Sequence, residues 1–324
     1  MSQKAAFLPE LSLPAIAAPM FLISGPELVV ECCKQGIVGT FPALNQRTSE
    51  GFEEWLVAIK EELNQWEEAT GKKAAPYGVN LIVHPTNPRL EADLRLCVKH
   101  EVPLIITSLG AVKQVVDAVH SYGGLVFHDV IKKRHAQKAA EAGVDGLILV
   151  AAGAGGHAGT INPMTLVAET QQFFDGTIIL SGCISTGRDV ASAMQMGADL
   201  AYMGTRFINV KESLAPEEYQ EMIIEAGASD VTYTAAISGV HANFLTASLK
   251  AAGISEEELK KGHKIDFGKE LDTEAKAWKT IWSAGQGAAL VKDTLPVDQL
   301  VEQLKQEFKV AIEEQSKLLL KYPK

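Results

Sequence analysis

Eight short apolar runs, each followed by a longer amphipathic or polar stretch, constrain this 324-residue chain more than any other feature of its sequence. Each run is too short for a helix, is rich in Val, Ile and Leu, and lacks the strict alternation of a strand with one solvent face. Such runs are typical of strands covered on both sides, as in a parallel sheet. The runs occupy residues 15–20, 36–44, 77–83, 102–109, 124–130, 146–152, 177–183 and 200–207.

The stretches between these runs have the apolar spacing of helices that cover a sheet. Three of them end in a glycine, at Gly123, Gly143 and Gly197, where a residue of positive φ commonly closes a helix. The repeated order of strand, helix, glycine and strand predicts an α/β fold, a (β/α)8 TIM barrel, which commonly takes about 250 residues as one domain. An open, doubly wound sheet of eight strands is the alternative.

The pattern changes after Phe207, because no ninth strand–helix unit is evident there. We expect helices at residues 215–227 and 242–262, and a polar segment at 263–280 that covers the barrel mouth. The last stretch predicts a long closing helix, since its apolar residues recur every four positions and form one face. Those residues are Leu300, Leu304, Phe308 and Ile312. The expected parts are the barrel at 1–210, a helical appendage or lid at 211–280, and a C-terminal segment and helix at 281–324 that pack back on the barrel.

The net charge of −10 and the pI near 5.4 argue against a nucleic-acid partner, because no stripe of Lys and Arg is present to neutralise phosphates. No apolar run approaches the roughly 18 residues of a membrane span. Cys32, Cys33, Cys97 and Cys183 form no C-x-x-C pair and have no His at zinc-ligand spacing, so we expect reduced thiols and no metal site. These features predict a cytoplasmic protein that binds a small molecule and no membrane, and they leave a homodimer open.

A glycine-rich loop with one titratable side chain follows the sixth run, in "AAGAGGHAGT". In parallel barrels the active site is built from the loops after the strands, and glycines there allow a ligand to approach the backbone closely. His157 in this loop is therefore the predicted catalytic residue, with an incidental loop histidine as the alternative. The loose G-x-G-x-x-A pattern through Gly153, Gly155 and Ala158 carries little weight, because it does not follow a first strand or lead directly into a helix.

The loops after the seventh and eighth runs read "SGCISTG" and "MGTRF". Backbone N–H groups of Gly182, Cys183, Gly204 and Thr205, with the Thr205 hydroxyl, predict the phosphate site that barrels commonly place there. No Walker lysine follows, so hydrolysis of a nucleoside triphosphate is not indicated. The alternative is that both loops are only tight turns.

Other polar or soft residues at strand ends are weaker candidates. Ala18, Pro19 and Met20 close the first run with side chains suited to lie under a flat aromatic ring. Asn80 would place an amide in the barrel core unless it meets a ligand or a backbone partner. The fifth run ends in His128 and Asp129, either of which could reach the site. The remaining histidines are interpreted as surface or structural residues, namely His84, His100, His120, His135, His241 and His263.

Several motifs together resemble one family over nearly the full length. They are "PAIAAPM" near the start, "YGVNL" on the third run, "GVDGLILVAAGAGGHAG" across the sixth, "LSGCISTGRDVASAMQMGADLAYMGTRF" across the last two, and "IWSAGQG" at residues 281–287. With these motifs the chain closely resembles the nitronate monooxygenases, formerly called 2-nitropropane dioxygenases. The combination is specific for a flavin-binding barrel, although each piece alone is not.

The resemblance implies a tightly bound flavin mononucleotide (FMN). By position, the isoalloxazine side would be lined by Ala18, Pro19, Met20 and Asn80. The ribityl chain and the phosphate would be held by Gly156, Gly182, Gly204 and Thr205. His157 would lie beside the flavin and act on the substrate, and Gly285 and Gln286 would return to the flavin from the C-terminal part.

The activity implied by the resemblance is oxidation of alkyl nitronates by O2, giving carbonyl compounds and nitrite. Relatives of the same pattern use NAD(P)H to reduce quinones or enoyl thioesters, and this reductase activity is the alternative. A flavin-binding sensor without turnover is a third hypothesis. The chain departs from the family at Cys183, where many members have a second glycine, and at Asp129, where some have Lys or Ser.

Overall fold

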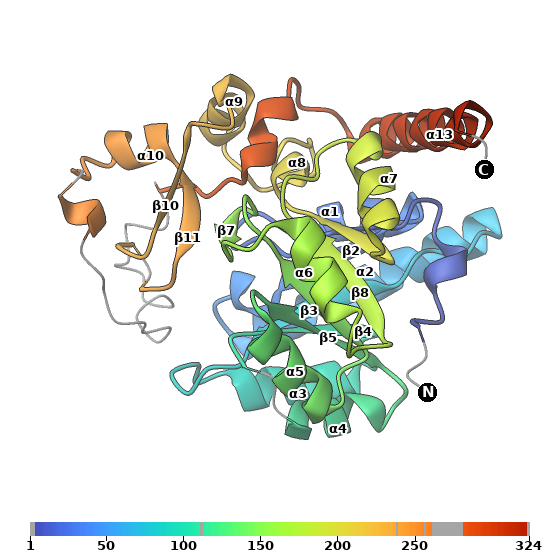
Figure 1. Ribbon diagram of the computed structural model, residues 1–324. Coiled ribbons are helices and arrows are strands. Elements are labelled where there is room, and N and C mark those ends of the chain that lie inside the picture. The colour runs from blue at the N-terminus through green and yellow to red at the C-terminus, as the bar shows by residue number, and fades with distance from the viewer. Residues whose placement is uncertain (1–3, 111–112, 238, 256, 261–280, 323–324) are drawn as a thin grey trace.

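The computed structural model describes residues 4–110, 113–237, 239–255, 257–260 and 281–322 (Figure 1). Parallel strands are hydrogen-bonded in the order β1-β2-β3-β4-β5-β6-β8-β9, and β1 also pairs with β9. This last pairing closes the sheet, so the (β/α)8 prediction is confirmed and the open doubly wound sheet is wrong. The barrel strands are β1 (Ala15–Ala17), β2 (Val38–Pro42), β3 (Tyr77–Ile82), β4 (Leu104–Ser108), β5 (Leu125–Val130), β6 (Gly146–Val150), β8 (Thr177–Ser181) and β9 (Leu200–Met203).

Helices surround the barrel on the outside, and a smaller part of the chain lies beyond the carboxyl ends of its strands (Figure 1). The helices of the barrel layer are α1 (Pro26–Lys34), α2 (Ser49–Thr70), α3 (Leu90–Lys99), α4 (Lys113–His120), α5 (Lys133–Ala142), α6 (Pro163–Thr170) and α7 (Gly187–Met196). The later helices are α8 (Thr205–Ile208), α9 (Glu217–Glu225), α10 (Thr246–Ala251) and α13 (Val297–Lys321). Short 3₁₀ helices are η1 (Leu8–Glu10), η2 (Ala43–Asn45), η3 (Glu258–Lys260) and η4 (Gln286–Leu290).

The barrel strands are buried on both faces, because helices pack outside and side chains fill the interior. In β4, alternate residues point to the barrel interior and to the layer beneath the helices. Leu104 and Ile106 belong to the cluster inside the barrel, and Ile105 belongs to the layer beneath the helices. The N-terminal segment packs into the same interior cluster, where the ring of Phe7 lies 6.3 Å from the ring of Phe127. A ligand therefore has room at the opposite end, where the strands reach their carboxyl termini.

The helix ends follow the glycine pattern of the sequence. Gly143 and Gly197 close α5 and α7 in the left-handed region, with φ of 89° and 102°, and Gly123 after α4 has φ of 85°. The predicted positive φ at these three positions is confirmed. At its other end α7 has a capping box, in which Thr186 and Asp189 bond each other's backbone N–H groups.

The closing helix predicted from the four-residue spacing is confirmed as α13, which packs against α7 and α1. Leu300 and Leu304 on its apolar face are fully buried. The contact with α7 is so close that a Cβ atom at Gly187 would lie 1.9 Å from the carbonyl oxygen of Leu304. A glycine is therefore required where α7 begins.

Beyond the barrel, part of the prediction is wrong. The helix expected at 215–227 is present as α9, but the helix expected at 242–262 is not continuous. Its first residues form β11 (Ala242–Leu245), which pairs antiparallel with β10 (Val231–Thr234) and with β7 (Gly156–His157). Four residues are too few for a periodicity that separates strand from helix. The polar segment expected to cover the mouth, 263–280, lies outside the described residues.

Every barrel strand is shorter than its apolar run, and β1 and β9 stop furthest before the run ends. β1 ends at Ala17 rather than at Met20, and β9 ends at Met203. The chain then turns through Gly204 into α8, so the strand expected up to residue 207 is wrong in its last residues. Both early endings place backbone N–H and C=O groups at the barrel mouth, outside the ladder of the sheet.

Candidate active site

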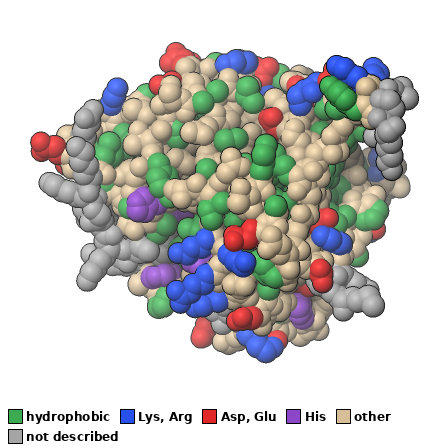
Figure 2. Space-filling view, viewed as in Figure 1, with side chains coloured by type: hydrophobic (Ala, Val, Ile, Leu, Met, Phe, Trp, Pro, Cys, Tyr) green, Lys and Arg blue, Asp and Glu red, His purple; other side chains and the backbone are tan. Residues whose placement is uncertain are grey.

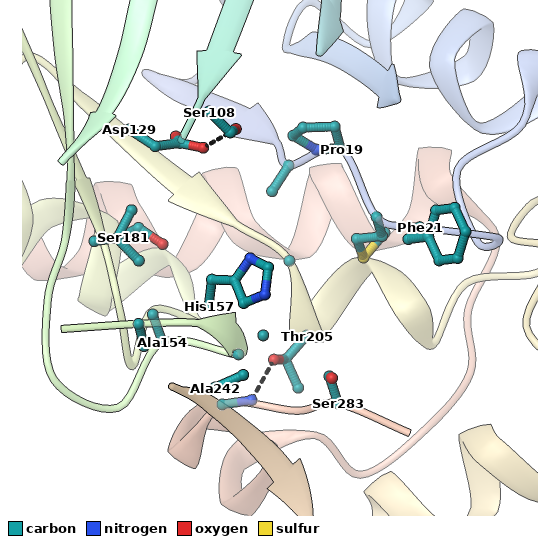
Figure 3. Close-up of a pocket in the computed structure, with 18 of the residues that line it drawn as sticks. Pro19, Phe21, Ser108, Asp129, Ala154, His157, Ser181, Thr205, Ala242 and Ser283 are labelled. Carbon is teal, nitrogen blue, oxygen red and sulfur yellow. Dashed lines mark hydrogen bonds between the residues drawn. The ribbon is translucent and has the colours of Figure 1, made fainter. Parts of the chain in front are cut away.

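A cavity of about 1260 Å³ opens at the carboxyl ends of the barrel strands (Figure 3). Ligand sites of drug-sized molecules commonly have about 300–1,000 Å³, so this cavity has room for a large ligand together with a small one. The predicted site residues that line it are Ala18, Pro19, Met20, Asn80, Gly156, His157, Gly182, Cys183, Gly204, Thr205 and Gly285. Gln286 is the predicted residue that does not line it.

The loop that carries His157 is held by a segment far away in the sequence. As part of β7, Gly156 and His157 pair with Asn243 and Ala242 of β11. The amide of Asn243 donates to the carbonyl oxygen of Ala154 at 2.6 Å, which fixes the start of the same loop. The glycine-rich loop is therefore an ordered strand edge, and its histidine has a defined direction.

The imidazole of His157 projects into the cavity, between the side chains of Asp129 and Ser108 on one side and Thr205 on the other (Figure 3). Burial lowers the pKa of His157 to about 4, because an apolar environment disfavours the charged ring. The ring is therefore neutral at neutral pH. From the sequence alone only the ordinary histidine pKa near 6.5 could be assumed, and that value applies to an exposed side chain.

The "WSAGQG" segment joins the site through backbone contacts. The N–H of Gly285 donates to the Thr205 hydroxyl at 2.9 Å, and the N–H of Gln286 donates to the carbonyl oxygen of Gly153 at 2.9 Å. A Cβ atom at Gly285 would lie 2.5 Å from that carbonyl oxygen of Gly153, so a side chain there has no room. The side chain of Gln286 is exposed, and its amide oxygen lies 3.8 Å from the sulfur of Cys183.

The loop after β8, which is predicted to bind a phosphate, has part of its backbone already hydrogen-bonded. The carboxylate of Asp189 accepts the N–H groups of Ser185 and Thr186 at 3.0 and 2.9 Å, so those two amides are occupied by α7 itself. Gly182 and Cys183, just before them, have φ of 124° and 58°. The left-handed backbone at Cys183 explains why glycine suits this position, and it turns the loop toward the cavity.

Asn80, Ser108 and Asp129 are joined by hydrogen bonds at the cavity wall, and this connection was not predicted. The hydroxyl of Ser108 donates to Oδ2 of Asp129 at 2.5 Å, and Nδ2 of Asn80 donates to the Ser108 hydroxyl oxygen at 2.8 Å and to the carbonyl oxygen of Ile106 at 3.2 Å. Burial raises the pKa of Asp129 to about 6, and the Ser108 hydrogen bond opposes that rise. Ser108 is the next-to-last residue of the fourth run and ends β4, and this strand-end position is the signal that could have identified it.

The other histidines near the cavity differ in their burial and in their contacts. His128 is buried with its Nδ1 2.8 Å from the Thr107 hydroxyl, and burial lowers its pKa to about 4. His241, interpreted from sequence as surface or structural, lines the cavity and stacks on Tyr233 with ring centroids 5.1 Å apart. His135 of α5, also interpreted from sequence as surface or structural, lines the cavity as well.

The mouth of the cavity carries positive charge on α5. Lys138 lines the cavity, and burial together with the nearby cations Lys132, Arg134 and Lys138 lowers the pKa of His135. On the face drawn in Figure 2, Lys and Arg side chains gather beside histidines, although the chain as a whole has a net charge of −10.

Within the described ranges, three further features bear on the kind of site. All four cysteines are free thiols, and Cys183 is the exposed one. No three His, Cys, Asp or Glu side chains of those ranges are grouped so that they could hold a metal ion. No helix in the part of the chain that the structure describes is both long and apolar enough to cross a bilayer.

Comparison with known proteins gives a consistent assignment. A family model described as nitronate monooxygenase matches residues 6–307. The nitronate monooxygenase of Paraburkholderia phytofirmans is 34% identical over 53% of this chain and 51% of that protein, so the chain spans about half the length of that relative. The nitronate monooxygenase of Neurospora crassa is 26% identical over 92% of this chain and 89% of that protein.

A solved structure shows the same fold. The nitroalkane oxidase of Streptomyces ansochromogenes superposes with a TM-score of 0.81 at 22% identity, covering 96% of this chain and 100% of that one. The family model, both relatives and this neighbour are named for oxidation reactions. Because the family model matches nearly the whole length, the chain belongs to the nitronate monooxygenase family.

Proposed function

We propose that this protein is an FMN-dependent monooxygenase that oxidises alkyl nitronates with O2 to carbonyl compounds and nitrite. The observation that carries the proposal is a neutral, directed His157 inside a cavity that adjoins two phosphate-type loops. A histidine of this kind can donate a hydrogen bond to the oxygen of an anionic nitro group. The substrate and O2 are the only partners that this reaction needs.

The loops after β8 and β9 favour a mononucleotide as the cofactor. With the amides of Ser185 and Thr186 taken by Asp189, the N–H groups that fit a phosphate are those of Gly182, Cys183, Gly204 and Thr205. Thr205 begins α8, so its N–H is a first-turn amide without an intrahelical acceptor, and its hydroxyl proton can still be donated. One such phosphate site favours FMN over a dinucleotide.

The space in the cavity fits a flat ring system. A Cβ atom at Gly156 would meet no atom within 4 Å, and one at Gly204 would meet only Ala18 and Met20, at 3.8 and 3.9 Å. Both glycines therefore leave their backbone open to a ligand. Met20, with its polarizable sulfur, lies on the same wall, where it can contact an aromatic ring.

The bound flavin would supply the electron transfer, and the protein would supply binding, orientation and electrostatics. The protonated nitrogen of the neutral His157 ring would donate to a nitronate oxygen. Buried apolar residues that line the same cavity, such as Val150 and Ile184, would keep water away from the anion.

The proposal is tested anaerobically, with the absorbance of the bound flavin as the indicator. We expect rapid bleaching when an alkyl nitronate such as propionate 3-nitronate is added, slower change with NADH or NADPH, and nitrite once O2 is admitted. Rapid bleaching by NADH or NADPH with none by nitronates would replace the proposal with a flavin reductase that acts on quinones or enoyl thioesters. Bleaching by neither would leave a binding protein without turnover.

A further inference from the structure

Asp129 brings an acidic side chain into the cavity that the proposed reaction does not use. Its Oδ2 accepts the hydroxyl proton of Ser108, whose oxygen in turn accepts from Asn80. Its Oδ1 is buried and has no hydrogen-bond partner among the described residues. An ionised carboxylate is unfavourable in such surroundings, whereas a carboxylic acid can place its proton on the unpartnered oxygen.

We propose that Asp129 is a neutral carboxylic acid in the flavin-bound protein, and that binding of the flavin ring takes up one proton at this side chain. The inference rests on the flavin site of the proposed function. Asn80, which lines the same cavity and is predicted to lie on the isoalloxazine side, is hydrogen-bonded to the same Ser108 that holds Asp129. A ring placed on this wall removes the remaining water from a side chain that is only partly buried without it.

Among the described residues, only burial and the Ser108 hydrogen bond contribute to the shifted pKa of Asp129, and no cation lowers it. Tyr202 of β9 lies near it across the barrel, and burial raises the pKa of this phenol well above its usual value, so it is neutral. His128, the neighbour on β5, and His157 have pKa values of about 4 and are uncharged near neutral pH. The remaining titratable groups on the cavity wall are His135, Lys138, His241, Cys183, Tyr219 and Tyr233.

The pKa of Asp129 in the protein without flavin decides how affinity for the ring changes with pH. Burial raises the pKa of Asp129 to about 6, so the acid form dominates below that pH and the carboxylate above it. If the ring binds to the acid form, affinity is highest below about pH 6 and falls up to tenfold for each pH unit above it. If the carboxylate instead accepts an N–H from the ring, affinity rises with pH.

The test measures the dissociation constant of riboflavin for the apoprotein by fluorescence quenching, from about pH 5 to about pH 8. Riboflavin is used because the phosphate of FMN itself titrates near pH 6. We expect affinity to fall by up to about 100-fold between about pH 6 and pH 8. Asp129→Asn, which has the same shape and no charge, should bind with little dependence on pH.

Three further variants test the assignment to this side chain. Asp117→Asn removes one acidic charge on α4, outside the cavity wall, and should keep the pH dependence of the parent. His241→Asn removes another titratable group of the wall and should also keep it. Ser108→Ala removes the hydrogen bond that favours the ionised form, so the fall in affinity should begin at a higher pH.

Each outcome separates the two proposals. Riboflavin affinity that rises with pH, or that is independent of pH in the parent protein, overturns the neutral acid at Asp129 while leaving the flavin site intact. The same holds if Asp129→Asn keeps the full pH dependence. Absence of riboflavin and FMN binding at every pH overturns the flavin site of the proposed function itself.

Discussion

Replacing His157 by Asn tests the central residue of the site, because Asn keeps a polar side chain of similar reach but cannot titrate. The parent ring is neutral at neutral pH, since burial lowers its pKa to about 4. A positioned acid, base or hydrogen-bond donor of this kind contributes roughly 10²–10⁴-fold to turnover. We expect His157→Asn to retain the fold and the flavin and to lose turnover by that factor.

The structure also predicts where the parent enzyme loses activity. The neutral ring is the active form, so activity is present above the folded-state pKa and is lost as the pH falls through about 4. At pH 5 a group with a pKa of about 4 is still about 90% neutral, whereas a group at the ordinary value near 6.5 would be only about 3% neutral. The value of kcat/KM at pH 5 should therefore be close to that at pH 7.

The measurement uses initial rates of nitrite formation from preformed nitronate, before the nitronate is protonated on carbon. Histidine proton resonances give an independent value, because the signal missing from the His157→Asn spectrum identifies the ring and its titration. His120→Asn, an exposed change outside the cavity, serves as the control and should match the parent. A roughly 20-fold loss between pH 7 and pH 5, with a titration midpoint near 6.5, would refute the argument from burial.

Three other changes test the site and its scaffold. Thr205→Glu should yield colourless protein, because an anion would face the phosphate and the bond from Gly285 would be lost; full flavin absorbance would contradict this. Cys183→Gly should raise thermal stability slightly, by up to about 1 kcal/mol, because φ is 58° there; a lower melting temperature would argue against strain. Gly187→Ala should destabilise by roughly 1–3 kcal/mol in denaturant unfolding, since its Cβ would clash with Leu304, and an unchanged midpoint would contradict this.

The barrel could be predicted because its signal is local. Each strand is a short apolar run, each helix has its own apolar face, and Gly123, Gly143 and Gly197 mark helix ends within the same segment. The strand at Ala242–Leu245 has no such signal. It exists because it pairs with Val231–Thr234 and with the loop of His157, and only the folded chain brings these together.

The candidate site also has a part that could be predicted from the sequence and a part that depends on the folded chain. The rule that barrel sites lie at strand ends was enough to select His157, Gly182, Gly204 and Thr205. It could not show that Ser108 bonds both Asp129 and Asn80, because that contact depends on the register of three neighbouring strands. Nor could it give the pKa of His157, since burial is a property of the whole cavity.

Two of the groups of the cavity whose pKa is shifted, His157 and Asp129, both move toward their uncharged forms. Under the proposed function this has a chemical use, because a nitronate reacts as an anion and an imidazolium ring beside it would be an acid able to protonate it. A ring whose pKa is lowered to about 4 still donates a hydrogen bond but rarely carries the extra proton. A neutral Asp129 likewise places no negative charge against the same anion. Burial in this cavity therefore acts in one direction on both residues, and it keeps the substrate, rather than the protein, as the charged species.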